Sequence, residues 1–315
     1  RARGRGAGRG GWVATYSGWA ACFLLELVAV LTIPFILKYV PAEDTRHSHL
    51  DVFGVFLVAV IATGIVLFMQ KFNWWFLLPA VAAIAVFGWH ISTHPDALIT
   101  REFFRNRRYT MMLAVVFVVY SVQLGYQFIF PFIIQGIYGW KLSNVALLLV
   151  PGYSAAVVVG ALSGKIAAHL SSRRAIVIAM TMIAVALAIP AFLVGGWVGT
   201  FAISMVLFGS GFALMYAPLL STAIRDVPRA KSGIAIGFYN LIINMAVPIG
   251  IAFAATLRNL GLSLTSFTGQ SPKEASYGSV LLILAIITVL ALLLYRIFIR
   301  MLEREDDANA AMMVA

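Results

Sequence analysis

The sequence predicts an all-α membrane protein built as a bundle of about nine transmembrane helices. Of its 315 residues, 62% are hydrophobic and only 11% are charged, whereas soluble chains carry about 25% charged residues. The mean hydropathy is +0.94. The apolar residues also gather in long uninterrupted runs, and such runs must be helices because backbone polar groups in lipid have to be satisfied internally. Transmembrane strands would instead alternate between apolar and polar residues.

Nine runs are near or above the roughly 20 residues that span a bilayer as helix. In chain order they are 18–40, 51–69, 73–91, 109–137, 142–168, 174–194, 197–223, 232–257 and 277–301. Residues 1–17 are basic and rich in glycine, and no apolar stretch precedes them, so they do not resemble a signal peptide. The sequence further predicts a loop from residue 41, a linker over 92–108 and a solvated tail over 302–315.

The orientation is predicted from the connections, which alternate between basic and nearly neutral. The basic set holds Lys38, Arg46, Arg101, Arg105, Arg107, Arg108, Lys165, Arg173, Arg174, Arg225, Arg229, Lys231, Arg296, Arg300 and Arg304. The other set holds only Lys71, Lys141, Arg258 and Lys273. The positive-inside rule places the basic set and the C-terminus in the cytoplasm of a multi-pass protein of the cell membrane. The net charge of +11 therefore reflects topology and gives no reason to expect a nucleic-acid partner.

Polar side chains within the runs are few and fall on single helix faces. They are Tyr120, Gln123, Gln127 and Gln135 in run 109–137, and Asn240 and Asn244 in run 232–257. Because polar groups in hydrocarbon are costly, we expect both faces to line a cavity for a small-molecule substrate. Interhelical hydrogen bonding is the alternative for each residue taken singly.

Small residues and prolines predict close, movable helix packing. Small residues at four-residue spacing, which include Gly160 and Gly164 in one run and Gly233 and Gly237 in another, allow close helix contact. Seven prolines lie within the runs, Pro151 and Pro248 among them, and their kinks favour a mobile transporter over a rigid anchor.

Glu26 is the only acidic residue well inside a predicted span. A carboxylate in the membrane can take up and release a proton, so Glu26 is our candidate for coupling protons to transport. The alternatives are a carboxyl group bonded to a neighbouring polar group or one lying among lipid headgroups.

No hydrolase, ATPase or cofactor motif is present, and neither a metal nor a cofactor is predicted. His47 and His49 lie in a polar stretch that is typical of a solvated loop. A lipid-linked transferase would need paired acids at a span end, and Asp51 and Asp96 show no pairing. A proton-pumping respiratory subunit would need several buried charges. The near absence of acids within the spans favours a carrier, which is not an enzyme, over both alternatives.

Three segments carry patterns of one known family of membrane proteins. The segment FIIQGIYGWKLSNVALLLVPG carries matching positions at Gln135, Gly139, Ser143, Leu149 and Pro151. GALSGKIAAHLSSRR is similar to a loop of the form G-x-L-x-D-R-x-G-x-R at Gly164 and Arg173. The stretch from RDVPRAKSG onward matches a loop and penultimate helix at Pro228, Gly233, Gly237, Asn240 and Gly250. With these segments the chain resembles the major facilitator superfamily, in particular its fourteen-helix drug:proton antiporters.

This resemblance covers nearly the whole chain and implies an exporter of drugs or other cationic or amphipathic molecules. It implies that 1–17 is the remnant of a preceding helix and 18–40 the last helix of the N-terminal half. It further implies that 41–91 holds a loop and two extra central helices, and 109–301 a complete six-helix C-terminal half. The missing part of the N-terminal half would then be required for transport. Ala168 and His169 stand where the family loop has Asp and Arg, which argues against a salt bridge there.

Overall fold

The structure is a computed structural model, and it describes residues 51–94, 106–228 and 231–314, together with a few isolated positions before residue 39. The described helices are α4 (Val52–Lys71), α5 (Trp74–Thr93), α7 (Arg107–Tyr138), α8 (Leu142–Leu170), α9 (Ser172–Phe192), α10 (Gly199–Ala223), α11 (Ser232–Leu260), the short 3-10 helix η2 (Ser266–Thr268) and α12 (Pro272–Val314).

Eight of these helices are long and apolar enough to cross a membrane. They coincide with the last eight predicted runs, which confirms the all-helical membrane class. The first predicted run, 18–40, falls almost entirely outside the described residues.

The last helix differs most from its predicted bounds. α12 begins at Pro272, five residues before the predicted start, and continues to Val314 through the segment predicted as a tail. A capping box explains the early start, because the Ser271 N–H donates to Glu274 Oε2 at 2.7 Å and the Glu274 N–H to Ser271 Oγ at 3.4 Å. Proline suits the first helical position, which a hydropathy pattern does not reveal.

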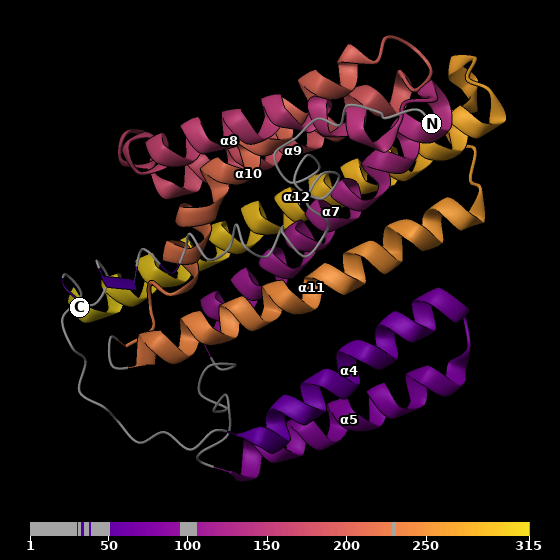
Figure 1. The fold of residues 1–315 in the computed structure, drawn as a ribbon. Helices are drawn as coiled ribbons and strands as arrows, with labels where there is room; N and C mark the ends of the chain where they lie inside the picture. Colours follow the sequence, from indigo (N-terminus) through magenta and orange to yellow (C-terminus); the bar gives the residue numbers. More distant parts are fainter. Residues whose placement is uncertain are drawn as a thin grey trace.

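The helices lie side by side in an order that differs from the chain order (Figure 1). α10 packs against both α8 and α9, α9 packs against α12, and α12 against α7. α7 then packs against α11, whose other side meets α4 of the α4–α5 hairpin. The Thr256 hydroxyl of α11 donates to the Met69 carbonyl of α4 at 2.8 Å and ties the hairpin to the bundle.

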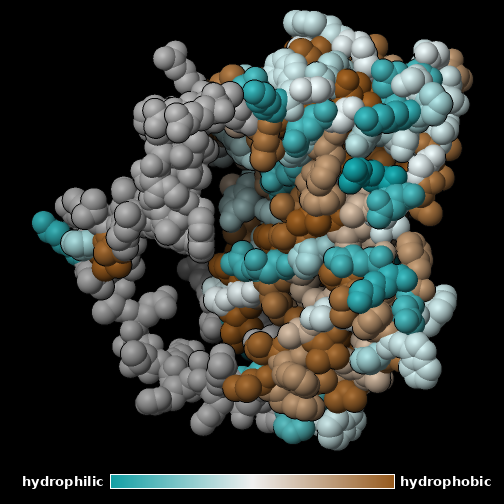
Figure 2. All heavy atoms as spheres, turned by 45° about the vertical axis from the view of Figure 1, so that its right-hand side comes forward, coloured by the Kyte–Doolittle hydropathy of each residue, from teal (hydrophilic) through white to brown (hydrophobic). Residues whose placement is uncertain are grey.

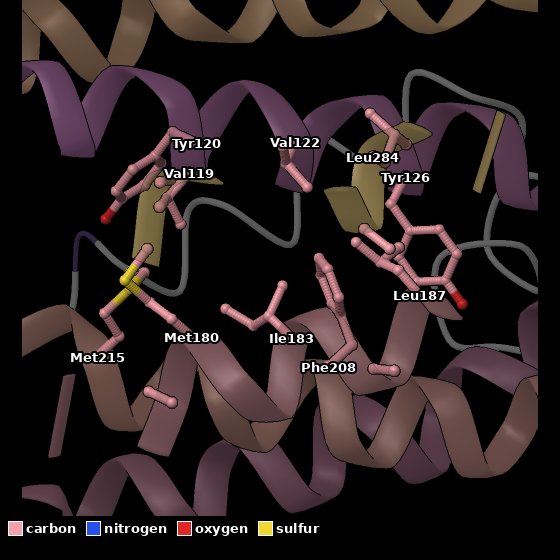
Figure 3. Close-up of a cluster of buried hydrophobic side chains, with 14 of the residues drawn as sticks. Val119, Tyr120, Val122, Tyr126, Met180, Ile183, Leu187, Phe208, Met215 and Leu284 are labelled. Atoms are coloured by element: carbon pink, nitrogen blue, oxygen red, sulfur yellow. The ribbon is translucent and has the colours of Figure 1, made fainter. Parts of the chain in front are cut away.

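The core lies between α7, α9, α10 and α12. Figure 3 shows one part of it, where Val119 and Val122 of α7 face Ile183 of α9 and Phe208 of α10. Tyr126 is fully buried among these residues and its hydroxyl meets Ser204 Oγ at 2.7 Å. The Ser204 hydroxyl in turn donates to the Ala186 carbonyl of α9, so one polar chain joins three helices.

The outer surface is largely apolar, as a lipid-facing surface must be. Brown, apolar side chains cover much of the face that Figure 2 shows, with hydrophilic residues among them. Large exposed apolar residues also occur along the middle of the helices, for example Val157 of α8 and Leu290 of α12. A water-soluble fold would not expose so many.

Candidate functional site

The polar face predicted on α7 contributes one residue to a cluster of three tyrosines, which we call the tyrosine cluster. Its members are Tyr120 of α7, Tyr216 of α10 and Tyr239 of α11. Tyr120 and Tyr239 are 5% and 1% exposed, whereas Tyr216 is 48% exposed. The hydroxyls of the three side chains lie in one region.

The two buried hydroxyls of this cluster, on Tyr120 and Tyr239, lie within hydrogen-bonding influence of each other. Neither Oη atom meets a donor or acceptor in good bonding geometry among the described residues. An unsatisfied buried hydroxyl costs about 1–3 kcal/mol, so a group that could bond to these atoms would be favoured here.

The tyrosine cluster is surrounded by aromatic rings and by the polarisable thioethers of methionine. Phe212 of α10 packs edge-on against Tyr120 with ring centroids 5.0 Å apart. Figure 3 shows Tyr120 beside Met180 of α9 and Met215 of α10, both fully buried. Aromatic rings and polarisable thioethers with a few polar atoms suit an amphipathic or cationic organic ligand.

The other polar residues predicted for a cavity lie elsewhere. Gln123 and Gln127 are half-buried on α7, while Gln135, Asn240 and Asn244 are exposed. Two of these side chains bond within their own helix: Gln135 Nε2 donates to the Pro131 carbonyl at 3.2 Å, and Asn244 Nδ2 to the Asn240 carbonyl at 2.9 Å. Among the described residues, no hydrogen bond links the polar face of α7 to that of α11, and their role as a cavity lining stays a prediction.

Of the small residues predicted to pack, Gly160 lies against α10, whereas Gly164, Gly233 and Gly237 lie on open faces of α8 and α11. A Cβ atom added at Gly164, Gly233 or Gly237 would meet nothing within 4 Å among the described atoms. At Gly160 it would meet only the Cβ of Ala213, at 3.8 Å. The open parts of these stripes are therefore surfaces on which further helices could pack, and their packing role also stays a prediction.

The closest helix contacts occur at other glycines. A Cβ at Gly152 of α8 would lie 2.6 Å from the Met205 carbonyl oxygen of α10, and one at Gly209 would lie 2.5 Å from that of Gly152. Gly250 of α11 meets the Ser121 backbone of α7 as closely. Neither of the two stripes singled out in the sequence contains these glycines, and only the paired helices reveal them.

The remaining predicted residues are placed as follows. Pro151 is exposed on α8 and Pro248 half-buried on α11. Arg173 is half-buried and lines a cavity at the ends of α8 and α9, together with Ala168 and His169. Glu26, the proton-coupling candidate, lies outside the described residues.

Sequence reasoning missed Tyr216 and Tyr239. Tyr239 is adjacent to Asn240, but it points to the opposite, buried side of α11, where α7 packs. The sequence signal that could have indicated them is that both tyrosines lie within otherwise apolar runs. The sequence alone does not show which helix faces pack together.

The fold and this cluster define a polytopic helical membrane protein that could hold an organic ligand between its helices. Among the residues that the structure describes, no group of three or more His, Cys, Asp or Glu side chains could hold a metal ion. The chain belongs to the Major Facilitator Superfamily, whose family model matches residues 6–251. This is a family of transporters, not of enzymes, so the transferase alternative does not apply.

Similar proteins include several named for drug resistance. One is MdtD of Yersinia enterocolitica, which is named as a provisionally assigned multidrug resistance protein. It is 22% identical to this chain over 306 residues, which cover 92% of this chain and 64% of the relative. Another is the multidrug resistance protein Stp of Mycobacterium tuberculosis, 23% identical over 268 residues, covering 81% of this chain and 50% of the relative. The riboflavin transporter RibZ of Clostridioides difficile is 21% identical over 257 residues, covering 78% of this chain and 55% of the relative. The chain thus spans about half to two thirds of these relatives.

Proposed function

We propose that this chain is part of a proton-coupled secondary transporter that exports drugs or other amphipathic or cationic small molecules. The main support is the tyrosine cluster, in which two buried hydroxyls lie near each other without a well-formed hydrogen bond among the described residues, beside a half-exposed third ring. The names of MdtD and Stp support the same substrate class. Within the family, the resemblance favours the fourteen-helix drug:proton antiporters.

In this proposal the three tyrosines hold the substrate, with Tyr216 as the exposed wall of the site and the two buried hydroxyls as polar contacts. A cation over an aromatic face gains about 0.5–2 kcal/mol, depending on how far it is desolvated. Gln123 and Gln127, half-buried on the same helix as Tyr120, would extend the polar lining.

We also propose that transport requires the additional length that the relatives have. Gly164 of α8 and Gly233 and Gly237 of α11 are open among the described atoms, and a second group of helices packing there would complete the transport path. Secondary transporters work by rocking one bundle against another around a central site. We therefore expect residues 1–315 expressed alone to give no export.

The orientation is proposed from charge. Arginines of α7, α9 and α12 and of the segment after α10 gather at one end of the bundle, and the positive-inside rule assigns that end to the cytoplasm. A reporter fused to the C-terminus that is active only in the cytoplasm would test this, and activity of a periplasmic reporter instead would contradict it.

The substrate site is tested with the protein of full family length in a drug-sensitive, efflux-deficient host. Ethidium export is measured for Tyr216→Ala and for Tyr239→Phe, which removes only the hydroxyl. Tyr153→Ala serves as the matched control, because Tyr153 is an exposed tyrosine of α8 outside the cluster. We expect export to fall about tenfold for Tyr216→Ala and severalfold for Tyr239→Phe, with the control unchanged. Equal loss in all three variants would remove the cluster from the transport path.

Proton coupling is tested separately. Collapsing the pH gradient with an ionophore should stop ethidium export, and Glu26→Gln should stop it while leaving ethidium binding intact. Export that persists in Glu26→Gln would exclude Glu26 as the coupling residue. Export that persists without a proton gradient would exclude proton coupling altogether.

A further inference from the structure

A second site lies at the end of the bundle where α8 and α10 end, α7 and α9 begin, and the Arg296–Leu302 segment of α12 passes. It is a cavity of about 1360 Å³. Six arginines line it, namely Arg108, Arg173, Arg174, Arg225, Arg296 and Arg300. The tyrosine cluster does not contribute to its lining, so the two sites are distinct.

The fold gathers these arginines from three helices and one segment between helices: Arg108 from the start of α7, and the others from α9, the segment after α10, and α12. Ser171, with a φ of +66°, is the single residue between α8 and α9, and this tight turn holds Arg173 and Arg174 at the rim. Arg225 follows the last residue of α10 by two positions. Arg296 and Arg300 lie four residues apart on α12 and therefore share one face.

The described lining of the cavity is strongly basic. Its lining within the described part of the chain includes no acidic residue. The nearby Asp226 is paired with the buried Arg108, whose Nε lies 2.9 Å from Asp226 Oδ2, and is itself 45% exposed. Like charges four residues apart on a helix repel, and a concave, low-dielectric wall concentrates the positive potential.

Guanidinium groups converging on one cavity have a preferred ligand. The planar fork of donors on arginine matches the oxygens of a phosphate, which it binds in bidentate fashion. Arg174, Arg225, Arg296 and Arg300 are exposed, so their donors can reach a ligand that enters from outside.

The source of the phosphate follows from the apolar part of the lining. Val177, Ile178, Ile299 and Leu302 line the same cavity, and Ile178 is 40% exposed. Helix ends of a membrane protein lie at the level of the lipid headgroups, so the arginines could meet a headgroup while the apolar residues meet its acyl chains. A soluble phosphate would gain nothing from these apolar residues.

We propose that this cavity binds the phosphate of an anionic phospholipid. Such a lipid would neutralise the exposed arginines Arg174, Arg225, Arg296 and Arg300 and link α9, α10 and α12. The proposal is independent of the transported substrate, because no residue of the tyrosine cluster takes part.

The experiment measures lipid binding to the purified full chain in detergent by native mass spectrometry. The probes are phosphatidylglycerol, which is anionic, and phosphatidylcholine, which has the same phosphate but no net charge. Inorganic phosphate at millimolar concentration serves as a soluble competitor. We expect phosphatidylglycerol to bind at least tenfold more tightly than phosphatidylcholine and to resist displacement by inorganic phosphate.

Two matched double variants separate the cavity from the general positive charge of this end. Arg174→Gln/Arg296→Gln removes two exposed cavity arginines, and Arg107→Gln/Lys165→Gln removes two exposed basic residues at the same end outside the cavity. We expect the first to weaken phosphatidylglycerol binding tenfold or more and the second less than twofold. If the first does not fold, Arg174→Lys/Arg296→Lys keeps the charge but loses the fork, and should weaken binding severalfold.

Three results would overturn the proposal. Equal losses in the two glutamine variants would reduce the effect to surface charge. Equal affinity for the two lipids would exclude anion recognition, and displacement by inorganic phosphate would make a soluble anion the ligand.

Discussion

The backbone contact between α8 and α10 gives the sharpest test of the packing. Gly152 and Gly209 allow the two helices to touch, and a Cβ at Gly209 would lie 2.5 Å from the Gly152 carbonyl oxygen. A carbon and a carbonyl oxygen approach no closer than about 3.3 Å. Gly209→Ala therefore requires the two helices to separate locally by about 0.8 Å.

The expected cost follows from this displacement. Overpacking a tight contact costs about 1–3 kcal/mol, and the better helix propensity of alanine returns at most about 1 kcal/mol. With that gain subtracted, the net loss in the free energy of unfolding is up to about 2 kcal/mol. Taking about 2–4 °C for each kcal/mol, the midpoint of thermal unfolding should fall by up to roughly 8 °C.

The assay is thermal unfolding of the purified chain in one mild detergent, followed by intrinsic tryptophan fluorescence. Gly164→Ala is the matched control, since it makes the same change on α8 where a Cβ meets no described atom within 4 Å. Its midpoint should stay the same or rise. An equal midpoint for Gly209→Ala and the control would refute the close contact of α8 with α10.

Three further substitutions probe the other contacts. Tyr126→Phe removes a buried hydroxyl that meets Ser204 Oγ at 2.7 Å and should lower the free energy of unfolding by about 1 kcal/mol. Ser204→Ala should lower it further, because this change leaves the tyrosine hydroxyl unpaired. A smaller loss for Ser204→Ala would contradict this order. His90→Ala breaks a buried contact, in which His90 Nε2 lies 2.9 Å from Asp51 Oδ2, and should lower the free energy of unfolding by about 1–3 kcal/mol. Rapid proteolysis between α4 and α5 would report the loosened hairpin. An unchanged rate of proteolysis would contradict the role of the pair. Thr256→Val removes the hydroxyl that bonds to α4 and should increase hydrogen exchange in α4 while α9 stays protected; equal changes in both would mean global destabilisation instead.

Much of the fold could be predicted from the sequence because the length and apolarity of a span are local properties. The predicted runs match the starts and ends of α4 to α11 within a few residues. The bounds of α12 are the exception, since it begins before the predicted run and continues to Val314. Its early start depends on the Ser271 and Glu274 capping contacts, which add no apolar residue to the pattern.

The site was only partly predictable. Tyr120 was identified from its polar neighbours on α7, but Tyr216 and Tyr239 join it from helices far along the chain. Glycine spacing singled out Gly160 and Gly233, whereas the helices meet at Gly152, Gly209 and Gly250. A spacing rule identifies where a close approach is allowed but not where another helix arrives.

The sequence by itself determined the membrane class, the positions of the described spans and the family, since burial in lipid depends on each segment alone. Only the tertiary structure decided which helices are neighbours, which tyrosines meet and which arginines surround one cavity. The physical reason is that lipid is as apolar as the helix surfaces. Helix pairing is then governed by close packing and a few polar contacts, and these depend on two faces at once.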